Sequence, residues 1–342
     1  MSPRQWRILV VGGGSIGRRH IANWLALGQK TLGLVEPDAE TRARACSEFG
    51  LQGWAGLEAG LAWTPEVVLV ANPTSEHLET ALIAARQGCH LFIEKPLSDR
   101  LEGVDELVQL VQSQRLVSLI GCNMRFHPGP RLLRQALDEG RIGRPLSARL
   151  DVGSYLPSWR PGTDYRRSYS ARRSMGGGCL LDAIHELDAA CWYFGFPSEV
   201  MAMARPGTSL GIETEESVEV ILRFADDLIV SVHLDYVQRW RQRRGEIIGE
   251  RATALWDARR GEVLIGGPEG EPQRIGYEAG YDANAMYLDE LRHLLNALEG
   301  REPSCADAAW AARVTRVALA AKESAERRQP VALSWEPSPV SG

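Results

Sequence analysis

The feature that most constrains the fold of this chain is a glycine-rich hexapeptide, GGGSIG, at residues 12–17. It follows a short apolar stretch at residues 7–11 and opens a helical pattern at residues 16–27. In a G-x-G-x-x-G sequence the first glycine permits a tight turn, the second lets the backbone approach a pyrophosphate, and the third allows close contact between helix and strand. The helix N-terminus favours the anion. The motif predicts a dinucleotide site, with an ordinary glycine-rich turn as the alternative, and the expected contacts are Gly12, Gly14, Ser15, Ile16 and Gly17.

An acidic residue at the end of the second predicted strand bears on the identity of the cofactor. Glu36 follows Gly17 at the spacing at which a carboxylate accepts hydrogen bonds from the adenine ribose and repels a 2′-phosphate. NAD is therefore the expected cofactor. NADP stays open because Arg18, Arg19 and Arg42 lie nearby in the sequence, and a solvated charge at a strand end is the other interpretation of Glu36.

The first 125 residues alternate short β-branched stretches with amphipathic helical patterns, which is typical of βαβ units. This pattern predicts a doubly wound parallel sheet, a Rossmann domain, at residues 1–125. Asp99 and Glu102 have the spacing of a capping pair at the start of the last helix. The predicted strands are 7–11, 31–36, 67–71, 91–94 and 116–122, and the predicted helices are 16–27, 39–49, 75–87 and 99–114.

The pattern changes after residue 125, where prolines interrupt the chain before a short helix at about 131–138. Longer, alternating strands then predict an α+β domain at residues 126–330, built on an open, mostly antiparallel sheet with one solvated face. A short tail at 331–342 follows, and its end at 337–342 is expected to be mobile. The predicted strands are 146–155, 200–204, 217–224, 228–235, 245–249 and 252–257, and the closing helices are 284–298 and 306–325.

Composition favours small-molecule chemistry over a polymeric partner. The net charge of −5 on 342 residues gives no electrostatic reason to bind nucleic acid or an acidic membrane surface. No apolar run approaches the ~20 residues of a membrane-spanning helix. The six cysteines form no C-x-x-C pair or metal-like cluster, and the chain begins without the apolar core of a signal peptide, so we expect a cytoplasmic protein without a metal.

A lysine follows the fourth predicted strand in the sequence Glu94-Lys95-Pro96. It is one of only three lysines in the chain, and its position is at the carboxyl edge of the sheet, where open α/β sheets bind ligands. A partly desolvated lysine there exchanges a proton with a substrate hydroxyl more readily, because burial lowers its pKa. The alternative is a surface Lys95 paired with Glu94.

A second glycine block, GGGCLLDAIHELD, occupies residues 176–188. The residues after the glycines have helical periodicity, so Asp182 and His185, three positions apart, are predicted to share one face of a helix. A carboxylate and an imidazole presented together suit proton transfer. A helix cap or a surface pair is the alternative, and the ligands are too few for a metal site.

Together, the glycine motif, Glu94-Lys95-Pro96 and the second glycine block resemble the glucose–fructose oxidoreductase / inositol dehydrogenase / rhizopine catabolism (Gfo/Idh/MocA) family over about residues 5–330. The resemblance implies that Asn72, Pro73, His77, Glu94 and Lys95 border the cofactor. It also implies Lys95 as the catalytic lysine, Asp182 as its acidic partner and His185 as the group that exchanges the hydroxyl proton. Gly121–Phe126 resembles the family's G-Y-x-x-R-F element, with a cysteine in place of the aromatic residue.

One departure from the family pattern is the spacing D-x-x-H where D-x-x-x-H is usual. This shortened form resembles a subgroup associated with bacterial surface-sugar and sugar-nucleotide pathways. It leaves open whether Asp182 or His185 is the main proton-transfer partner.

The sequence therefore predicts an NAD(P)-dependent oxidoreductase that transfers hydride between nicotinamide and a hydroxyl or keto carbon of a sugar or cyclitol. The resemblance further implies a homodimer or homotetramer formed through the C-terminal sheet. A non-catalytic NAD-binding regulator or sensor, and a biosynthetic ketone or imine reductase, are the alternatives. The residues expected to contact substrate are Arg125, Tyr155, Trp159, Asp164 and Tyr165.

Overall fold

The computed structural model describes residues 4–277 and 281–335, which form two compact units. Unit 1 contains the described residues up to Phe126, together with Ser174–Gly176 and Asp282–Thr315. Unit 2 contains His127–Arg173, Gly177–Tyr281 and the described residues from Arg316 onward.

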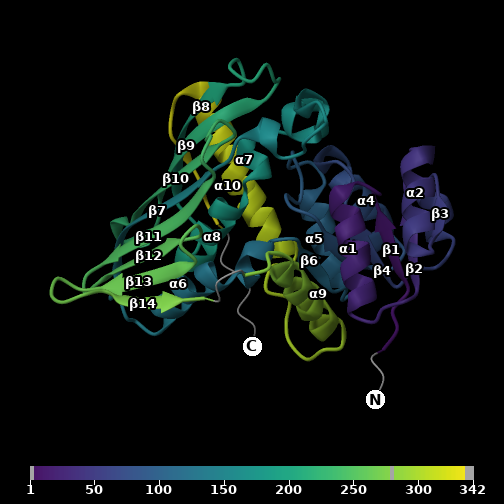
Figure 1. Cartoon of the computed structure of the whole chain (residues 1–342), viewed down its shortest axis with the longest axis horizontal. Coiled ribbons are helices and arrows are strands. Elements are labelled where there is room, and N and C mark those ends of the chain that lie inside the picture. Colours follow the sequence, from purple (N-terminus) through teal and green to yellow (C-terminus); the bar gives the residue numbers. More distant parts are fainter. Residues whose placement is uncertain (1–3, 278–280, 336–342) are drawn as a thin grey trace. The chain divides into compact units, whose positions relative to one another are not determined.

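Unit 1 is built on a six-stranded parallel sheet with the strand order β3-β2-β1-β4-β5-β6 (Figure 1). This is the predicted Rossmann arrangement, in which the direction of winding reverses between β1 and β4. Strands β1, β2 and β4 are buried along their whole length, as expected of a sheet covered on both faces. The elements are β1 (Ile8–Val11), α1 (Ser15–Ala26), β2 (Leu32–Val35), α2 (Ala39–Phe49), β3 (Gln52–Trp54), α3 (Leu57–Leu61), β4 (Val67–Val70), α4 (Thr74–Arg86), β5 (His90–Ile93), α5 (Val104–Ser113) and β6 (Ser118–Ile120).

Unit 1 differs from the sequence prediction in two places. Strand β3 and helix α3 were not predicted, because three and five residues are too few to show a periodic pattern. Helix α5 begins at Val104 and not at residue 99, so the predicted capping pair of Asp99 and Glu102 is wrong. Gly103 precedes the helix with φ 87°, a left-handed conformation that a right-handed helix does not include.

Unit 2 is built on a nine-stranded sheet with the order β14-β13-β12-β11-β7-β10-β9-β8-β15. Among the described strands of this second sheet only β7 and β10 pair in parallel, so the predicted open, mostly antiparallel sheet is confirmed. The elements are α6 (Pro128–Asp138), β7 (Pro145–Gly153), α7 (Cys179–Asp182), α8 (His185–Phe194), β8 (Glu199–Pro206), β9 (Glu215–Arg223), β10 (Ile229–Asp235), β11 (Gln242–Gly249), β12 (Thr253–Asp257), β13 (Glu262–Gly266), β14 (Gln273–Gly276) and β15 (Val331–Ala332).

Burial alternates along the strands of unit 2, so one face of the sheet is packed and the other is open. In β9, Val218, Val220 and Leu222 are buried. Helices α6 to α8 and the end of α10 (Ala308–Arg327) lie against this face (Figure 1). On the open face Met201 of β8 pairs with Ile221 of β9, and both are more than 40% exposed. The alternating pattern thus gives one apolar layer for the helices and one free sheet surface.

Helix α6 begins three residues earlier than predicted. The prolines near its start do not interrupt it, because Pro128 occupies its first turn, where a missing N–H costs no hydrogen bond. His127 caps the helix by accepting the N–H of Gly129 at 3.1 Å. Its ring lies within 5.4 Å of the rings of Trp256, Tyr277 and Tyr281.

The two closing helices do not both belong to the second unit, although the predicted domain boundaries placed both of them there. Helix α9 (Asn284–Leu298) belongs to unit 1, where Leu291 and Leu294 join the hydrophobic core and Asn284 exchanges side-chain amide hydrogen bonds with Asn23. Helix α10 (Ala308–Arg327) runs from unit 1 into unit 2. The predicted mobile end at 337–342 lies outside the described residues. In the described part of the chain, no helix has the length and apolarity needed to cross a membrane.

Candidate functional site

The glycine turn of unit 1 lies where the direction of winding reverses, between β1 and β4. The N–H of Gly12 donates to Val35 O at 2.8 Å, and the N–H of Ala71 donates to Val11 O at 2.7 Å, so the ends of three strands meet here. A Cβ placed on Gly17 would lie 1.9 Å from Gly12 O. Glycine is therefore required for helix α1 to start this close to the turn, as the motif predicts.

The start of helix α1 suits an anionic group. Gly14 precedes the helix in an extended conformation, offers no side-chain cap, and has no atom within 4 Å of a Cβ placed on it. The first turn of this 12-residue helix holds no acidic residue. The backbone N–H groups and the helix dipole therefore face open space that fits a pyrophosphate.

Glu36 is held beside this turn by two backbone groups. Its Oε2 accepts the N–H of Gly13 at 2.7 Å, and its Oε1 accepts the N–H of Asp38 at 2.9 Å. Because a carboxylate has about four acceptor positions, oxygen lone pairs remain for ribose hydroxyls. The fixed negative charge favours NAD at this position.

The three arginines that kept NADP open have other contacts in unit 1. Arg42 donates to Glu36 O at 2.6 Å, and Arg18 forms an ion pair with Glu48. The Arg19 guanidinium lies 4.7 Å from the centre of the Tyr287 ring. Each of the three guanidinium groups therefore already has a contact within unit 1, and this favours NAD over NADP.

His77 joins the two loops that follow β4 and β5. Its ring nitrogens lie 2.9 Å from Asn72 O and 2.8 Å from Pro96 O, and the peptide bond between Lys95 and Pro96 is cis. Burial lowers the pKa of His77 below its ordinary value, although the two carbonyl oxygens oppose this shift. The predicted segment Asn72-Pro73 and the predicted lysine thus meet at one edge of the sheet.

Glu94 is not a surface partner of Lys95, because its side chain is buried. Its Oε1 lies 2.6 Å from His20 Nε2, and its Oε2 accepts the backbone N–H of Lys95 at 3.2 Å. Burial alone would raise the pKa of Glu94, but the hydrogen bond and charge of His20 and the charge of Lys95 outweigh it and lower the pKa. His20 was not predicted, and its place in the middle of a helical pattern gives no signal for it.

The second glycine block folds as two short helices and not as one. Helix α7 ends at Asp182, Ala183 follows with φ −97° and ψ 29°, and α8 begins at His185. The prediction that Asp182 and His185 share one continuous helix face is therefore wrong. The two residues stand instead at the end of one helix and the start of the next, both within unit 2.

Three hydroxyl groups surround the Asp182 carboxylate, which is 8% exposed. Tyr169 donates to Oδ1, and Ser170 and Tyr236 donate to Oδ2 at 2.8 and 3.0 Å. A Cβ placed on Gly177 would lie 2.1 Å from Tyr169 O, so the glycine allows this segment to pass. No signal in the sequence pointed to these three hydroxyls, although Tyr169 and Ser170 lie only seven and six residues before the glycine block.

The predicted substrate residues of unit 2 do not gather at one point. Trp159 stands edge-on to Tyr236, with ring centres 5.4 Å apart, and so lies beside the Asp182 cluster. Tyr155 lies under the Arg239 guanidinium at 3.7 Å. Asp164 forms a local ion pair with Arg166, and Tyr165 donates to Leu210 O.

Arg125 has a different environment from the other predicted substrate residues, because it belongs to unit 1. It is buried, donates to Cys305 O at 2.5 Å and lies over the Trp310 ring at 4.6 Å. Through these contacts the segment after β6 packs against residues 305–310. A role for Arg125 in binding substrate rests on the resemblance alone.

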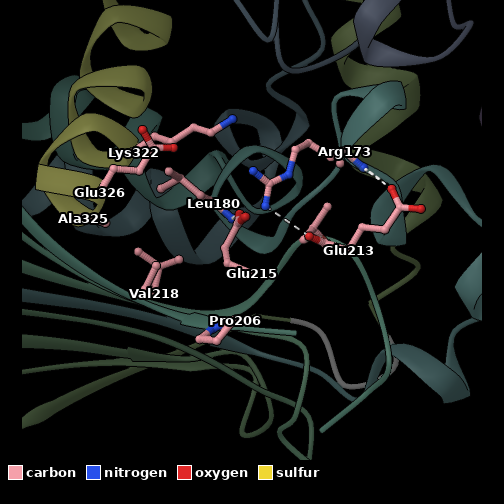
Figure 2. Close-up of a pocket in the computed structure, with 12 residues that line it drawn as sticks. Arg173, Leu180, Pro206, Glu213, Glu215, Val218, Lys322, Ala325 and Glu326 are labelled. Carbon is pink, nitrogen blue, oxygen red and sulfur yellow. Dashed lines mark hydrogen bonds between the residues drawn. The ribbon is translucent and has the colours of Figure 1, made fainter. Parts of the chain in front are cut away.

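A cavity of about 230 Å³ in unit 2 lies beside α7, and none of the predicted site residues lines it (Figure 2). The end of Arg173 points toward the carboxylate of Glu215, whose pKa is raised by burial despite the charges of Lys322 and Arg173. Leu180 faces this cavity. Asp182, two residues later on the helix, points to roughly the opposite side. Within residues 4–277 and 281–335, no group of three or more potential ligands is arranged for a metal ion.

Models of one oxidoreductase family match both parts of the chain. Residues 6–121 match the model described as oxidoreductase family, NAD-binding Rossmann fold, and residues 131–255 match the GFO/IDH/MocA C-terminal domain. Myo-inositol 2-dehydrogenase of Thermotoga maritima is 27% identical over 96% of this chain and 98% of that protein. 1,5-Anhydro-D-fructose reductase of Ensifer adhaerens is 27% identical over 88% of this chain and 91% of that protein.

Solved structures agree on the fold. Levoglucosan dehydrogenase in complex with NADH and levoglucosan has a TM-score of 0.87 at 22% identity, covering 96% of this chain and 99% of that chain. UDP-N-acetylglucosamine 3-dehydrogenase from Acidithiobacillus ferrooxidans has a TM-score of 0.79 at 25% identity, covering 95% and 99%. The two family models together span well over half of the chain, and the chain belongs to the Gfo/Idh/MocA family of NAD-binding oxidoreductases.

Proposed function

We propose that this enzyme transfers hydride between NAD and a hydroxyl-bearing or keto carbon of a sugar, sugar derivative or cyclitol. The observation that carries the proposal is the edge of the unit 1 sheet, where His77 joins the Asn72 loop to the Lys95-Pro96 segment. The names of the relatives, which include inositol, anhydrofructose and levoglucosan enzymes, support the substrate class. When bound, the nicotinamide supplies the acceptor or donor of hydride.

The residues of the chain bind and orient the substrate and move its hydroxyl proton. Gly12, Gly14, Ser15, Ile16 and Gly17 hold the pyrophosphate, and Glu36 holds the adenine ribose. We assign the exchange of the proton of the reacting hydroxyl to Lys95 and His185, and Asp182 is the acidic partner that the resemblance implies. The segment with Tyr155, Trp159, Asp164 and Tyr165 recognises the remaining hydroxyl groups.

The test uses purified protein and a substrate panel, with NAD for levoglucosan and myo-inositol and with NADH for 1,5-anhydro-D-fructose, and the absorbance of reduced nicotinamide is followed in both directions. Lys95→Ala is expected to lower turnover by on the order of 10²–10⁴-fold and to leave NAD affinity nearly unchanged. Lys30→Ala, at an exposed lysine, is the matched control. Unchanged turnover in Lys95→Ala would remove this lysine from the mechanism.

A double-mutant cycle tests whether Lys95 and His185 act on the same reaction step. If both serve one proton transfer, the double variant loses little more activity than the more damaged single variant. Fully additive losses contradict a shared step. An unchanged NAD affinity with no turnover on any polyol favours the alternative of a non-catalytic regulator or sensor. Faster turnover of ketones or imines than of polyols favours a biosynthetic reductase.

We also propose that two or four copies assemble through the open face of the unit 2 sheet. Met203 is 74% exposed there, and Met201 and Ile221 add apolar surface next to it. Met203→Glu is expected to lower the molecular mass measured by light scattering, whereas Leu101→Glu in unit 1 is the control. None of the six cysteines, all of which lie in the described part of the chain, forms a disulfide bond, which supports a reducing, cytoplasmic compartment.

A further inference from the structure

The buried carboxylate of Asp182 has an environment that the roles assigned above do not explain. Asp182 is the last residue of α7, and its side chain lies in the interior of unit 2. Three side-chain hydroxyls donate to its two carboxylate oxygens. Ser170 and Tyr236 share Oδ2, while Tyr169 donates to Oδ1. Removing a carboxylate from water is unfavourable, and several donors aimed at the charged form compensate for that loss.

The three hydroxyls are themselves fixed by the backbone around them. Ser170 O accepts hydrogen bonds from the N–H of Gly178 at 3.0 Å and from Thr214 Oγ1 at 2.9 Å. On the other side, the N–H of Tyr236 donates to Glu216 O at 2.8 Å. The donors therefore reach Asp182 from two chain segments that are separately anchored.

Tyr236 acts in this cluster as a hydrogen-bond donor only. Burial and the neighbouring Asp182 carboxylate raise the pKa of Tyr236 well above its ordinary value, so the phenol keeps its proton throughout the physiological range. Trp159 covers one edge of the Tyr236 ring and donates through its own Nε1 to Ser154 Oγ at 2.8 Å. The phenol is thus shielded and oriented toward Asp182.

We propose that Tyr169, Ser170 and Tyr236 are positioning residues that hold Asp182 as a fixed anion, so that Asp182 orients the reacting groups and His185 carries the proton. The proposal rests on the proposed function and answers the question that the shortened D-x-x-H spacing leaves open. A carboxylate that must release and take up a proton in each turnover would gain nothing from three donors that oppose its protonation.

The first experiment measures the titration of Asp182 directly and requires no substrate. In protein labelled with ¹³C at the aspartate carboxyl carbons, the Asp182 signal is identified by its loss in Asp182→Asn. In Tyr236→Phe the midpoint of this titration is expected to rise by about one pH unit, the size expected when one charge-assisted hydrogen bond is lost. Tyr193→Phe is the matched control, because the Tyr193 hydroxyl is also buried in unit 2 but donates to Pro130 O.

The second experiment follows activity against pH with the best substrate of the panel. Because His185 carries the proton, the acidic limb of kcat/KM reports this imidazole and not Asp182. In Tyr236→Phe we therefore expect kcat to fall, with NAD affinity unchanged. Ser170→Ala removes one small hydroxyl from the same oxygen, and it replaces Tyr236→Phe if the latter does not fold.

The outcomes separate this inference from the proposed function. If the Asp182 titration and kcat are unchanged in both Tyr236→Phe and Ser170→Ala, the positioning role is overturned. If Asp182→Asn is as active as the unmodified enzyme, the placement of Asp182 in the active site is overturned, whatever its titration shows.

Discussion

The two units hold their candidate residues by different means. In unit 1 these residues follow the ends of buried parallel strands, and backbone groups fix them: the Gly13 N–H holds Glu36, and the Asn72 and Pro96 carbonyls hold His77. In unit 2 the Asp182 carboxylate is held by side-chain hydroxyls from segments 12 to 54 residues away in the sequence. Backbone-held sites follow short motifs, whereas side-chain-held sites depend on distant segments.

The two units also differ in how they hold a buried charged side chain. Unit 2 contains a buried ion pair in which Arg243 donates twice to Glu186, at 2.6 and 3.0 Å. In unit 1 the buried carboxylate of Glu94 lies against one imidazole and accepts one backbone N–H. Unit 2 therefore depends more strongly on particular pairs of side chains, and four variants test this difference.

The largest loss of stability is expected from Arg243→Ala. It leaves the Glu186 carboxylate, whose side chain is 6% exposed, buried without its cation, at a cost of about 3–5 kcal/mol. The control is Arg144→Ala, which breaks a pair that is about half exposed on both sides and costs less than about 1 kcal/mol. Urea denaturation measures both, and equal small losses would contradict the dependence of unit 2 on this pair.

Gly17→Ala tests the backbone-held site of unit 1. The added Cβ would lie 1.9 Å from Gly12 O, so we expect a loss of about 1–3 kcal/mol in stability together with loss of NAD binding. Gly56→Ala, with no atom within 4 Å of its new Cβ, is the control for stability. Calorimetry of NAD binding and thermal unfolding measure the two effects, and normal NAD affinity in Gly17→Ala would show that the turn tolerates the displacement.

Glu36→Gln tests the charge at the ribose position. The substitution keeps the size of the side chain and removes the negative charge, so the preference for NAD over NADP is expected to fall by roughly tenfold or more. Glu40→Gln, at an exposed position four residues later, is the control. Dissociation constants of both nucleotides, measured by fluorescence quenching, give the ratio. An unchanged ratio would mean that another group selects the cofactor.

A pH-dependent effect on stability is expected at His233 on the open face of unit 2. Hydrogen bonds to Asp235 on its own strand and to Glu219 on β9 raise its pKa to about 9, although burial opposes the shift. Asp151 of β7 is its neighbour on the other side. Because the folded state binds this proton more tightly than the unfolded chain, the stabilisation is complete below about pH 6.5 and is lost as the pH rises through about 9.

The measurement at His233 compares two denaturation series. The difference in free energy of unfolding between the unmodified protein and His233→Gln is expected to shrink as the pH rises from about 6.5 to about 10. A difference that stays constant over this range would show that the His233 charge does not contribute to stability.

Much of the fold was predictable because its signals are local. The glycine motif, the alternation of strands and helices up to residue 125, and the alternating strands after residue 145 correspond to the two observed sheets. The β3 and α3 elements were too short for a periodic signal, and because of Gly103 helix α5 begins later than the predicted start at residue 99. The roles of the site residues stay predictions that the variants above test.

The sequence by itself determined the Rossmann half, the dinucleotide turn and the position of Lys95 at a sheet edge, because turn geometry and strand periodicity act over a few residues. Only the tertiary structure placed Tyr236 against Asp182, broke the helix between Asp182 and His185, and brought α9 into unit 1. These features come from contacts between segments far apart in the chain, where packing and burial, and not local propensity, select the arrangement.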